Sequence, residues 1–242
     1  MAILHDVQAT AQPPLTFLKT KHIKYWTRCL KTLLPEAYTS NDSNRMYLAY
    51  FILSALDLLG CLTDITTETE RSDYADWIYQ CQHSEGGFRM WPGTDFGEHG
   101  NERNKKWDPA NVPATYFALC SLLALGDDLS RLDRKGALRW LGRMQRPDGS
   151  FGETFVNGKV EGGRDPRFGY CAAGVRYMLR GRAEGSIHVD GEDVEDFDVD
   201  AVVSCVKAAE VGTLAHDHSV GWGHCLTGEL TFRADLRWRD SG

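Results

Sequence analysis

A repeated unit of Trp, Gln, Gly and Phe constrains the fold of this 242-residue chain more than any other feature. Residues 77–88 read WIYQCQHSEGGF, and residues 140–151 read WLGRMQRPDGSF. In both segments Gln follows Trp by five positions, Gly follows Gln by four, and Phe follows that Gly by two. Self-similarity at a fixed period predicts a repeat architecture, in which each unit buries its apolar face against its neighbours.

Each unit has a second half, which is a long apolar stretch that begins with Tyr. The three copies are YFILSALDLLG at 50–60, YFALCSLLALG at 116–126 and YCAAGVRYMLR at 170–180. We predict helices for them because they are rich in Leu and Ala and contain no Pro. The Trp-to-Gln stretches are predicted to be shorter amphipathic helices that end at glycine turns. A third copy of the turn is degraded, with Val203 and Ala208 in the Trp and Gln positions.

Two polar segments interrupt the repeats. Residues 89–113 are charged and rich in Gly and Pro, and loops of this length are commonly functional or mobile. Residues 183–200 are acidic and are expected to be a solvated linker before a helix that starts near Val199. Asp198 and Asp200 are both candidates for the N-cap of that helix.

Composition and charge exclude several classes of partner and location. The formal net charge is −7 and no basic block is present, so nucleic acid is not an expected partner. The apolar run 46–63 contains Asp57 and follows Arg45, which favours a core helix over a membrane span. The first residues lack the pattern of a secretion signal, so we expect a cytoplasmic protein. The seven cysteines are odd in number and lack paired close spacing, which is typical of reduced core thiols.

The chain resembles the β subunits of protein prenyltransferases over about residues 20–210. The turns QHSEGGF and QRPDGSF match the Gln-x3-Gly-Gly/Ser-Phe turns of that family. Residues 22–60, 113–151 and 165–179 are more specific, and within the family they resemble type I geranylgeranyltransferases, as does the short N-terminal lead. The resemblance implies an all-α fold, an α–α barrel or toroid of helical-hairpin repeats with alternating inner and outer helices.

The resemblance also implies an activity and partners. A type I enzyme transfers a geranylgeranyl group from geranylgeranyl diphosphate to the cysteine of a C-terminal CaaX motif, in proteins such as Rho-type small GTPases. It works as a heterodimer with an α subunit. A zinc ion is expected in the family, because a free thiol is mostly protonated at neutral pH and zinc holds it as the thiolate.

Six residues match substrate-binding positions of the family. Arg167 matches an arginine near the isoprenoid that also reaches the CaaX carboxylate through water. Tyr170, Cys171 and Tyr116 match positions that line the lipid pocket, and Phe51 matches an aromatic residue that contacts the last residue of the peptide. Without the family, all of these except Arg167 would be interpreted as packing residues.

The sixth residue, Tyr47, departs from the pattern. The family has a small Thr there in type I enzymes, which leaves room for the fourth isoprene unit, and a Trp in farnesyltransferases. Each buried methylene contributes about 0.8 kcal/mol, so a bulky side chain at this position affects the preferred donor length. A farnesyltransferase β subunit is therefore an alternative.

The C-terminal part departs further. We divide the chain into an N-terminal lead at 1–20, barrel repeats at 21–210 and a divergent tail at 211–242. The Asp-x-Cys pair and later His that bind zinc in the family are not recognisable, so we assign no catalytic or metal-binding residue. The tail has no ligand spacing that closes a tetrahedral site, although it contains His216, His218, His224 and Cys225.

Two hypotheses follow from the unusual tail. In the first, the chain is a truncated product or carries a tail from a wrong reading frame, its barrel is incomplete, and it is inactive alone. In the second, it is a non-catalytic helical-repeat module that binds a prenyl chain or a protein partner.

Overall fold

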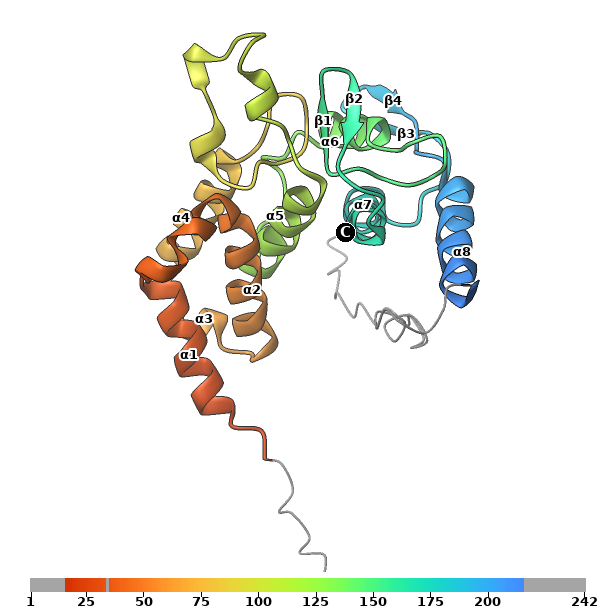
Figure 1. The fold of residues 1–242 in the computed structure, drawn as a ribbon. Coiled ribbons are helices and arrows are strands. Elements are labelled where there is room, and N and C mark those ends of the chain that lie inside the picture. The colour runs from red at the N-terminus through yellow and green to blue at the C-terminus, as the bar shows by residue number, and fades with distance from the viewer. Residues whose placement is uncertain (1–15, 34, 216–242) are drawn as a thin grey trace, which may run out of the picture.

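A computed structural model describes residues 16–33 and 35–215, which form two curved layers of helices (Figure 1). The inner layer contains α2 (Arg45–Leu58), α5 (Val112–Leu125) and α7 (Pro166–Arg180). The outer helices are α1 (Lys19–Lys31), α4 (Glu68–Gln80), α6 (Arg134–Arg143) and α8 (Val199–Ala215). The short helical elements are η1 (Glu36–Asn44), α3 (Leu62–Ile65), η2 (Pro92–Thr94), η3 (Gly97–His99) and η4 (Lys105–Trp107).

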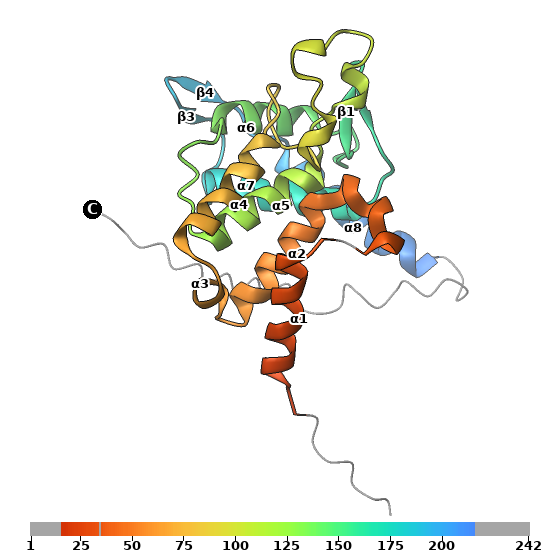
Figure 2. The same ribbon diagram turned by 90° about the vertical axis from the view of Figure 1, so that its left-hand side faces the viewer.

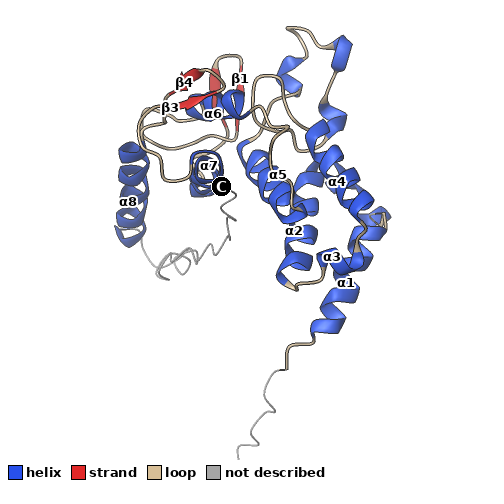
Figure 3. Ribbon diagram, turned by 180° about the vertical axis from the view of Figure 1, so that it is seen from behind, coloured by secondary structure: helices blue, strands red, loops and turns tan. Residues whose placement is uncertain are grey.

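The inner helices lie side by side, α2 against α5 and α5 against α7, while α1, α4 and α6 pack against α2, α5 and α7 respectively. Figures 2 and 3 show this arrangement from the side and from behind. The core lies between the layers and includes Leu53, Leu56, Leu119, Leu122 and Val175. The predicted helical toroid fold is confirmed, and the three Tyr-initiated stretches lie in α2, α5 and α7.

Two antiparallel hairpins accompany the helices. One pairs β1 (Thr154–Val156) with β2 (Lys159–Glu161), and the other pairs β3 (Ile187–Val189) with β4 (Glu192–Val194). Both lie at the same end of the helical layers as the loop between α4 and α5 (Figure 1). The expectation of a solvated linker is wrong for residues 187–194, since Val189 and Val194 are 5% and 2% exposed.

Local side-chain contacts define where the helices begin and end. Asn111 accepts a hydrogen bond from the Ala114 N–H at 2.9 Å and thereby caps α5. Asp198 accepts one from the Ala201 N–H at 2.8 Å, so of the two N-cap candidates for α8 it is Asp198 that caps the helix. Gly126 ends α5 with φ of 84°, a left-handed conformation that glycine adopts without a steric penalty.

The repeated turn joins one unit to the next. Phe88 and Phe151 are fully buried, at 0% and 1% exposure. The carbonyl oxygen of the Gln82 side chain accepts a hydrogen bond from the Asp133 N–H at 3.1 Å, and Asp133 is the N-cap of α6 in the following unit. The Gln and Phe of the repeat are therefore structural residues that hold successive helices in register.

The loop at 89–111 is anchored by a buried ion pair. Arg89 is 5% exposed and donates to both carboxylate oxygens of Asp108, at 2.5 and 2.8 Å. It also donates to the backbone carbonyl oxygen of Gln82 at 2.8 Å. A charge-assisted pair with two parallel hydrogen bonds has a well-defined geometry, so it holds the far end of the loop against the glycine turn.

The six cysteines within residues 16–33 and 35–215 are free thiols: Cys29, Cys61, Cys81, Cys120, Cys171 and Cys205. None of the helices described is long and apolar enough to cross a membrane.

Candidate functional site

A continuous series of aromatic rings crosses the three inner helices. We call it the aromatic belt, and its members are Tyr47, Tyr50, Phe51, Tyr116, Phe117 and Tyr170. The ring centroids of Tyr47 and Phe117 lie 4.8 Å apart, and those of Tyr50 and Phe117 lie 4.6 Å apart. Tyr116 and Tyr170 meet edge to face at 5.4 Å, and their hydroxyl oxygens are 3.0 Å apart. The belt therefore links α2 to α5 and α5 to α7.

The repeat explains why these rings lie together. Tyr50, Tyr116 and Tyr170 each begin one copy of the apolar stretch, and side-by-side inner helices bring equivalent positions to the same level. Phe51 is 53% exposed and Tyr170 is 47% exposed. A soluble protein rarely leaves neighbouring aromatic side chains exposed to water. A contiguous apolar surface of this kind is therefore typical of a binding site.

Four of the six predicted binding residues are members of the belt: Tyr47, Phe51, Tyr116 and Tyr170. Their roles in binding stay predictions. Cys171 adjoins the belt but is only 4% exposed, so its thiol belongs to the wall beneath the surface. The sequence-based selection missed Tyr50 and Phe117, although the aligned copies YFILSALDLLG and YFALCSLLALG place both beside predicted residues.

Arg167 lies at the start of α7, three residues before Tyr170 and therefore on the same side of the helix. Its guanidinium is exposed and forms an ion pair with Asp165, with an N–O distance of 2.5 Å. Hydrogen bonding to Asp165 raises the pKa of Arg167, and the same contact lowers the pKa of Asp165. The N-terminal end of α7 thus presents a fixed positive charge close to the belt, with a carboxylate beside it.

The belt itself is uncharged at neutral pH. Burial raises the pKa of Tyr47, and the positive charge of Arg167 offsets only part of that effect. Burial, followed by the hydrogen bond to Tyr170, raises the pKa of Tyr116. Burial also raises the pKa of Cys120 to about 11 and that of Cys171 to about 12. Neutral phenols and thiols form a surface that suits a hydrocarbon ligand.

A close approach of backbone and ring holds Tyr116 in place. A Cβ atom at Gly174 on α7 would lie 2.4 Å from Cε2 of the Tyr116 ring, so only glycine allows this packing of α5 against α7. Tyr116, at 7% exposure, is the most buried phenol of the belt. Its ring consequently has little freedom to move, and the neighbouring rings pack against it.

The described residues do not supply a zinc site. Within residues 16–33 and 35–215, no group of three or more His, Cys, Asp or Glu side chains could hold a metal ion. The tail residues His216, His218, His224 and Cys225 lie outside the described residues. The zinc that the family resemblance implies therefore has no ligands in the described part of the chain.

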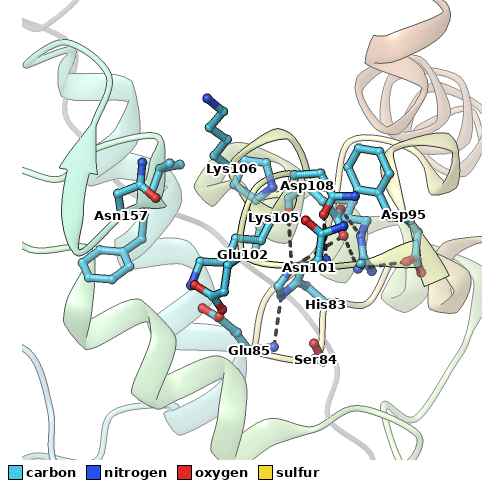
Figure 4. A pocket seen from close by; sticks show the side chains of 18 of the residues that line it. His83, Ser84, Glu85, Asp95, Asn101, Glu102, Lys105, Lys106, Asp108 and Asn157 are labelled. Atoms are coloured by element: carbon cyan, nitrogen blue, oxygen red, sulfur yellow. Dashed lines mark hydrogen bonds and ion pairs between the residues drawn. The ribbon is translucent and has the colours of Figure 1, made fainter. Parts of the chain in front are cut away.

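A polar hollow of about 540 Å³ lies between the loop at 95–108 and the β1–β2 hairpin. Figure 4 shows Asn157 of the hairpin on one side, with His83, Glu85 and Asp108 on the other. Most of its charged groups pair with one another: Lys105 with Glu102 at 2.6 Å, Arg143 with Glu85 at 3.8 Å, and Arg89 with Asp108. Because its lining is mostly polar and charged, the hollow is less suited to a hydrocarbon than the belt is.

The chain matches a known family and several known proteins. The family described as prenyltransferase alpha-alpha toroid domain matches residues 17–217. The Arabidopsis thaliana geranylgeranyl transferase type-1 subunit beta is 31% identical over 179 residues, which are 70% of this chain and 45% of that protein. The Dictyostelium discoideum geranylgeranyl transferase type-1 subunit beta is 32% identical over 179 residues, which are 66% of this chain and 49% of that protein.

Farnesyltransferase subunits and a solved structure are also similar. The Pyricularia oryzae protein farnesyltransferase subunit beta is 27% identical over 180 residues, 72% of this chain and 30% of that protein. The Candida albicans protein geranylgeranyltransferase-I complexed with GGPP matches with a TM-score of 0.64 and 26% identity, over 80% of this chain and 51% of that one.

The fold and the family match together define a helical toroid of the prenyltransferase class. The chain belongs to the prenyltransferase alpha-alpha toroid family, and it is similar to β subunits of type 1 geranylgeranyltransferases. It spans about half the length of the type 1 β subunits it matches.

Proposed function

We propose that this chain supplies the prenyl-binding surface of a protein geranylgeranyltransferase type I β subunit. In that role it binds geranylgeranyl diphosphate, pairs with a prenyltransferase α subunit in the cytoplasm, and serves transfer of the prenyl group to CaaX proteins such as Rho-type GTPases. The observation that carries the proposal is the aromatic belt, which is neutral, links the three inner helices and is exposed at Phe51 and Tyr170.

The hydrophobic effect favours a prenyl chain as the ligand of the belt. Each methylene removed from water contributes about 0.8 kcal/mol, and aromatic faces provide a large apolar contact area. The side chains of Phe51 and Tyr170 are about half exposed, so a bound chain would cover area that is now hydrated. Similarity to a geranylgeranyltransferase-I structure that contains GGPP supports the same ligand class.

Charge at one end of the belt suits the diphosphate. Arg167 and the N-terminal end of α7 both favour an anion, since the helix dipole is positive there. Asp165 accepts from the Arg167 guanidinium and from the Arg167 N–H at 2.9 Å, so a diphosphate would have to share these donors with it. We therefore propose that Arg167 orients the charged end of the donor.

The transfer step joins the sulfur of the CaaX cysteine to the first carbon of the prenyl group and releases diphosphate, while the thiol gives up its proton. A bound zinc ion would hold that sulfur as thiolate. The described residues do not fit such a site, so we assign binding of the donor, and not activation of the thiol, to this part of the chain.

Donor length depends on the space beside Tyr47. Its ring packs against Phe117 at 4.8 Å and is half-buried, so it occupies volume where a small residue would leave room. This observation favours a second candidate function, binding of the shorter farnesyl diphosphate, which is consistent with the similarity to farnesyltransferase β subunits.

The test is a titration of the full chain, co-expressed with a prenyltransferase α subunit, with geranylgeranyl and farnesyl diphosphate. We expect saturable binding that Arg167→Ala weakens and that Trp107→Ala leaves unchanged, because Trp107 is 66% exposed but lies outside the belt. Absence of binding to either diphosphate would overturn the proposal. Stronger binding of farnesyl diphosphate, reversed by Tyr47→Thr, would favour the second candidate.

Zinc content and transfer to a CaaX peptide ending in Leu separate an enzyme from a binding module. Stoichiometric zinc with prenyl transfer would place thiol activation within the complex. Diphosphate binding without zinc and without transfer would favour a non-catalytic prenyl-binding chain.

A further inference from the structure

We infer that Phe117, at the centre of the aromatic belt, is a specificity-determining residue that selects the length of the bound prenyl chain. The inference rests on the proposed function, since it concerns the ligand of the same surface. No family motif in the sequence assigns a role in binding to Phe117. If Phe117 takes part, the preferred length of the prenyl donor depends on the contact between α2 and α5 and not on Tyr47 alone.

Phe117 contacts more of the belt than a peripheral ring could. Its centroid lies 4.6 Å from that of Tyr50, 4.8 Å from Tyr47, 5.4 Å from Tyr116 and 6.0 Å from Phe51. All three rings of α2 therefore contact this one side chain of α5, and Tyr50 also contacts Tyr116 at 6.3 Å. Any change in the size of residue 117 alters the positions of all three.

The surroundings of Phe117 transmit such a change to the ligand surface. On one side Tyr116 is held by the close approach of Gly174 and by the hydroxyl contact with Tyr170, so it does not yield readily. On the other side Tyr47 and Phe51 are only partly buried and have room to move. Removing the Phe117 ring would consequently open space beneath Tyr47 and not within the core.

The repeat also shows that this position is variable in size. Phe51, Phe117 and Cys171 follow the initial Tyr of their respective copies, so they are equivalent positions on α2, α5 and α7. Two of them carry a phenyl ring and the third carries a small, buried thiol. At this position the inner surface therefore carries phenyl rings on α2 and α5 and only a small thiol on α7.

The experiment compares dissociation constants of farnesyl and geranylgeranyl diphosphate for the wild-type chain, Phe117→Ala and Phe117→Leu, each in complex with the α subunit. Opening space for roughly two more buried methylene groups should shift the ratio of the two constants about tenfold toward the longer donor in Phe117→Ala. Phe117→Leu should shift it in the same direction by less, and it keeps more of the packing if the Ala variant does not fold.

Phe168→Ala is the matched control. Phe168 is also a partly buried phenylalanine, on α7, and it packs near Gly162, so its loss should lower stability without changing the ratio. Binding with an unchanged ratio in both Phe117 variants would overturn this inference and leave the proposed function intact. Failure of the wild-type complex to bind either diphosphate would overturn the proposed function, and this inference with it.

Discussion

Gln145 forms two hydrogen bonds with the backbone of Asp198, which lies 53 residues further along the chain. Its side-chain oxygen accepts from the Asp198 N–H at 2.9 Å, and its side-chain nitrogen donates to the Asp198 carbonyl at 2.7 Å. Asp198 caps α8, just as Asp133, which is bonded to Gln82, caps α6. The repeated Gln is thus a link between one unit and the outer helix of the next.

Substitution Gln145→Ala should detach the N-terminal end of α8. Two hydrogen bonds are lost, each contributing about 1 kcal/mol, so we expect a decrease of about 2 kcal/mol in the free energy of unfolding. Hydrogen exchange should accelerate at the amides of residues 199–209. Gln80→Ala, at an exposed position on the last turn of α4, is the control. Unchanged exchange in α8 would show that Gln145 does not hold this helix.

Glycine at the repeated turn is required by packing as well as by conformation. Gly86 has φ of 102°, and a Cβ atom there would lie 2.3 Å from the Gly136 carbonyl oxygen of α6. Gly126 also has a positive φ, 84°, but a Cβ atom there meets nothing within 4 Å. We expect Gly126→Ala to cost about 1 kcal/mol through backbone strain and Gly86→Ala about 3 kcal/mol or more, because overpacking is added. Urea unfolding measures both, and equal costs would contradict the packing argument.

Two glycines of α7 should respond to alanine in opposite ways. A Cβ atom at Gly174 would lie 2.4 Å from the Tyr116 ring, whereas one at Gly169 meets nothing within 4 Å. Gly174→Ala should therefore lower stability by about 1–3 kcal/mol and displace Tyr116 from Tyr170. Gly169→Ala should raise stability by up to about 1 kcal/mol, since alanine favours the helix. Thermal unfolding and near-UV circular dichroism report the two effects, and destabilisation of equal size by both would rule out the specific clash.

Attachment of the β3–β4 hairpin to α6 should depend on pH through Glu192. Hydrogen bonds from Lys135 and Arg139 lower the pKa of Glu192 from 4.5 to about 2. Because the pKa is lower in the folded state, the stabilising effect is complete above pH 4.5 and is lost as the pH falls toward 2. We expect hydrogen exchange at residues 187–194 to accelerate over that range.

Glu192→Gln tests the origin of this pH dependence. The variant should exchange faster at neutral pH and should lose the additional acceleration in acid. Salt at molar concentration should reduce the difference between variant and wild type, since both ion pairs are solvent-accessible. A pH dependence that persists unchanged in Glu192→Gln would assign it to other carboxylates.

Part of the aromatic belt was predictable from the sequence, whereas the β3–β4 hairpin was not. Tyr116 and Tyr170 were identified because they match a motif, whereas Tyr50 and Phe117 match only their repeat partners, and a repeat by itself does not say which equivalent residues touch. The β3–β4 hairpin was missed because three of its eight residues, 187–194, are acidic, as is typical of solvated segments. Its stability comes from Val189, Val194 and Glu192, which all depend on contacts with distant residues.

The helices and the glycine turns follow from short-range rules that can be read from the sequence: apolar periodicity, capping side chains and glycine at each turn. The family follows from matched motifs such as QHSEGGF and QRPDGSF. Three relationships become apparent only in the folded chain: Gln145 binds Asp198, Gly174 makes room for Tyr116, and Phe117 contacts three rings of α2. Those relationships join residues from separate units, and their energies arise only when the inner and outer layers pack together.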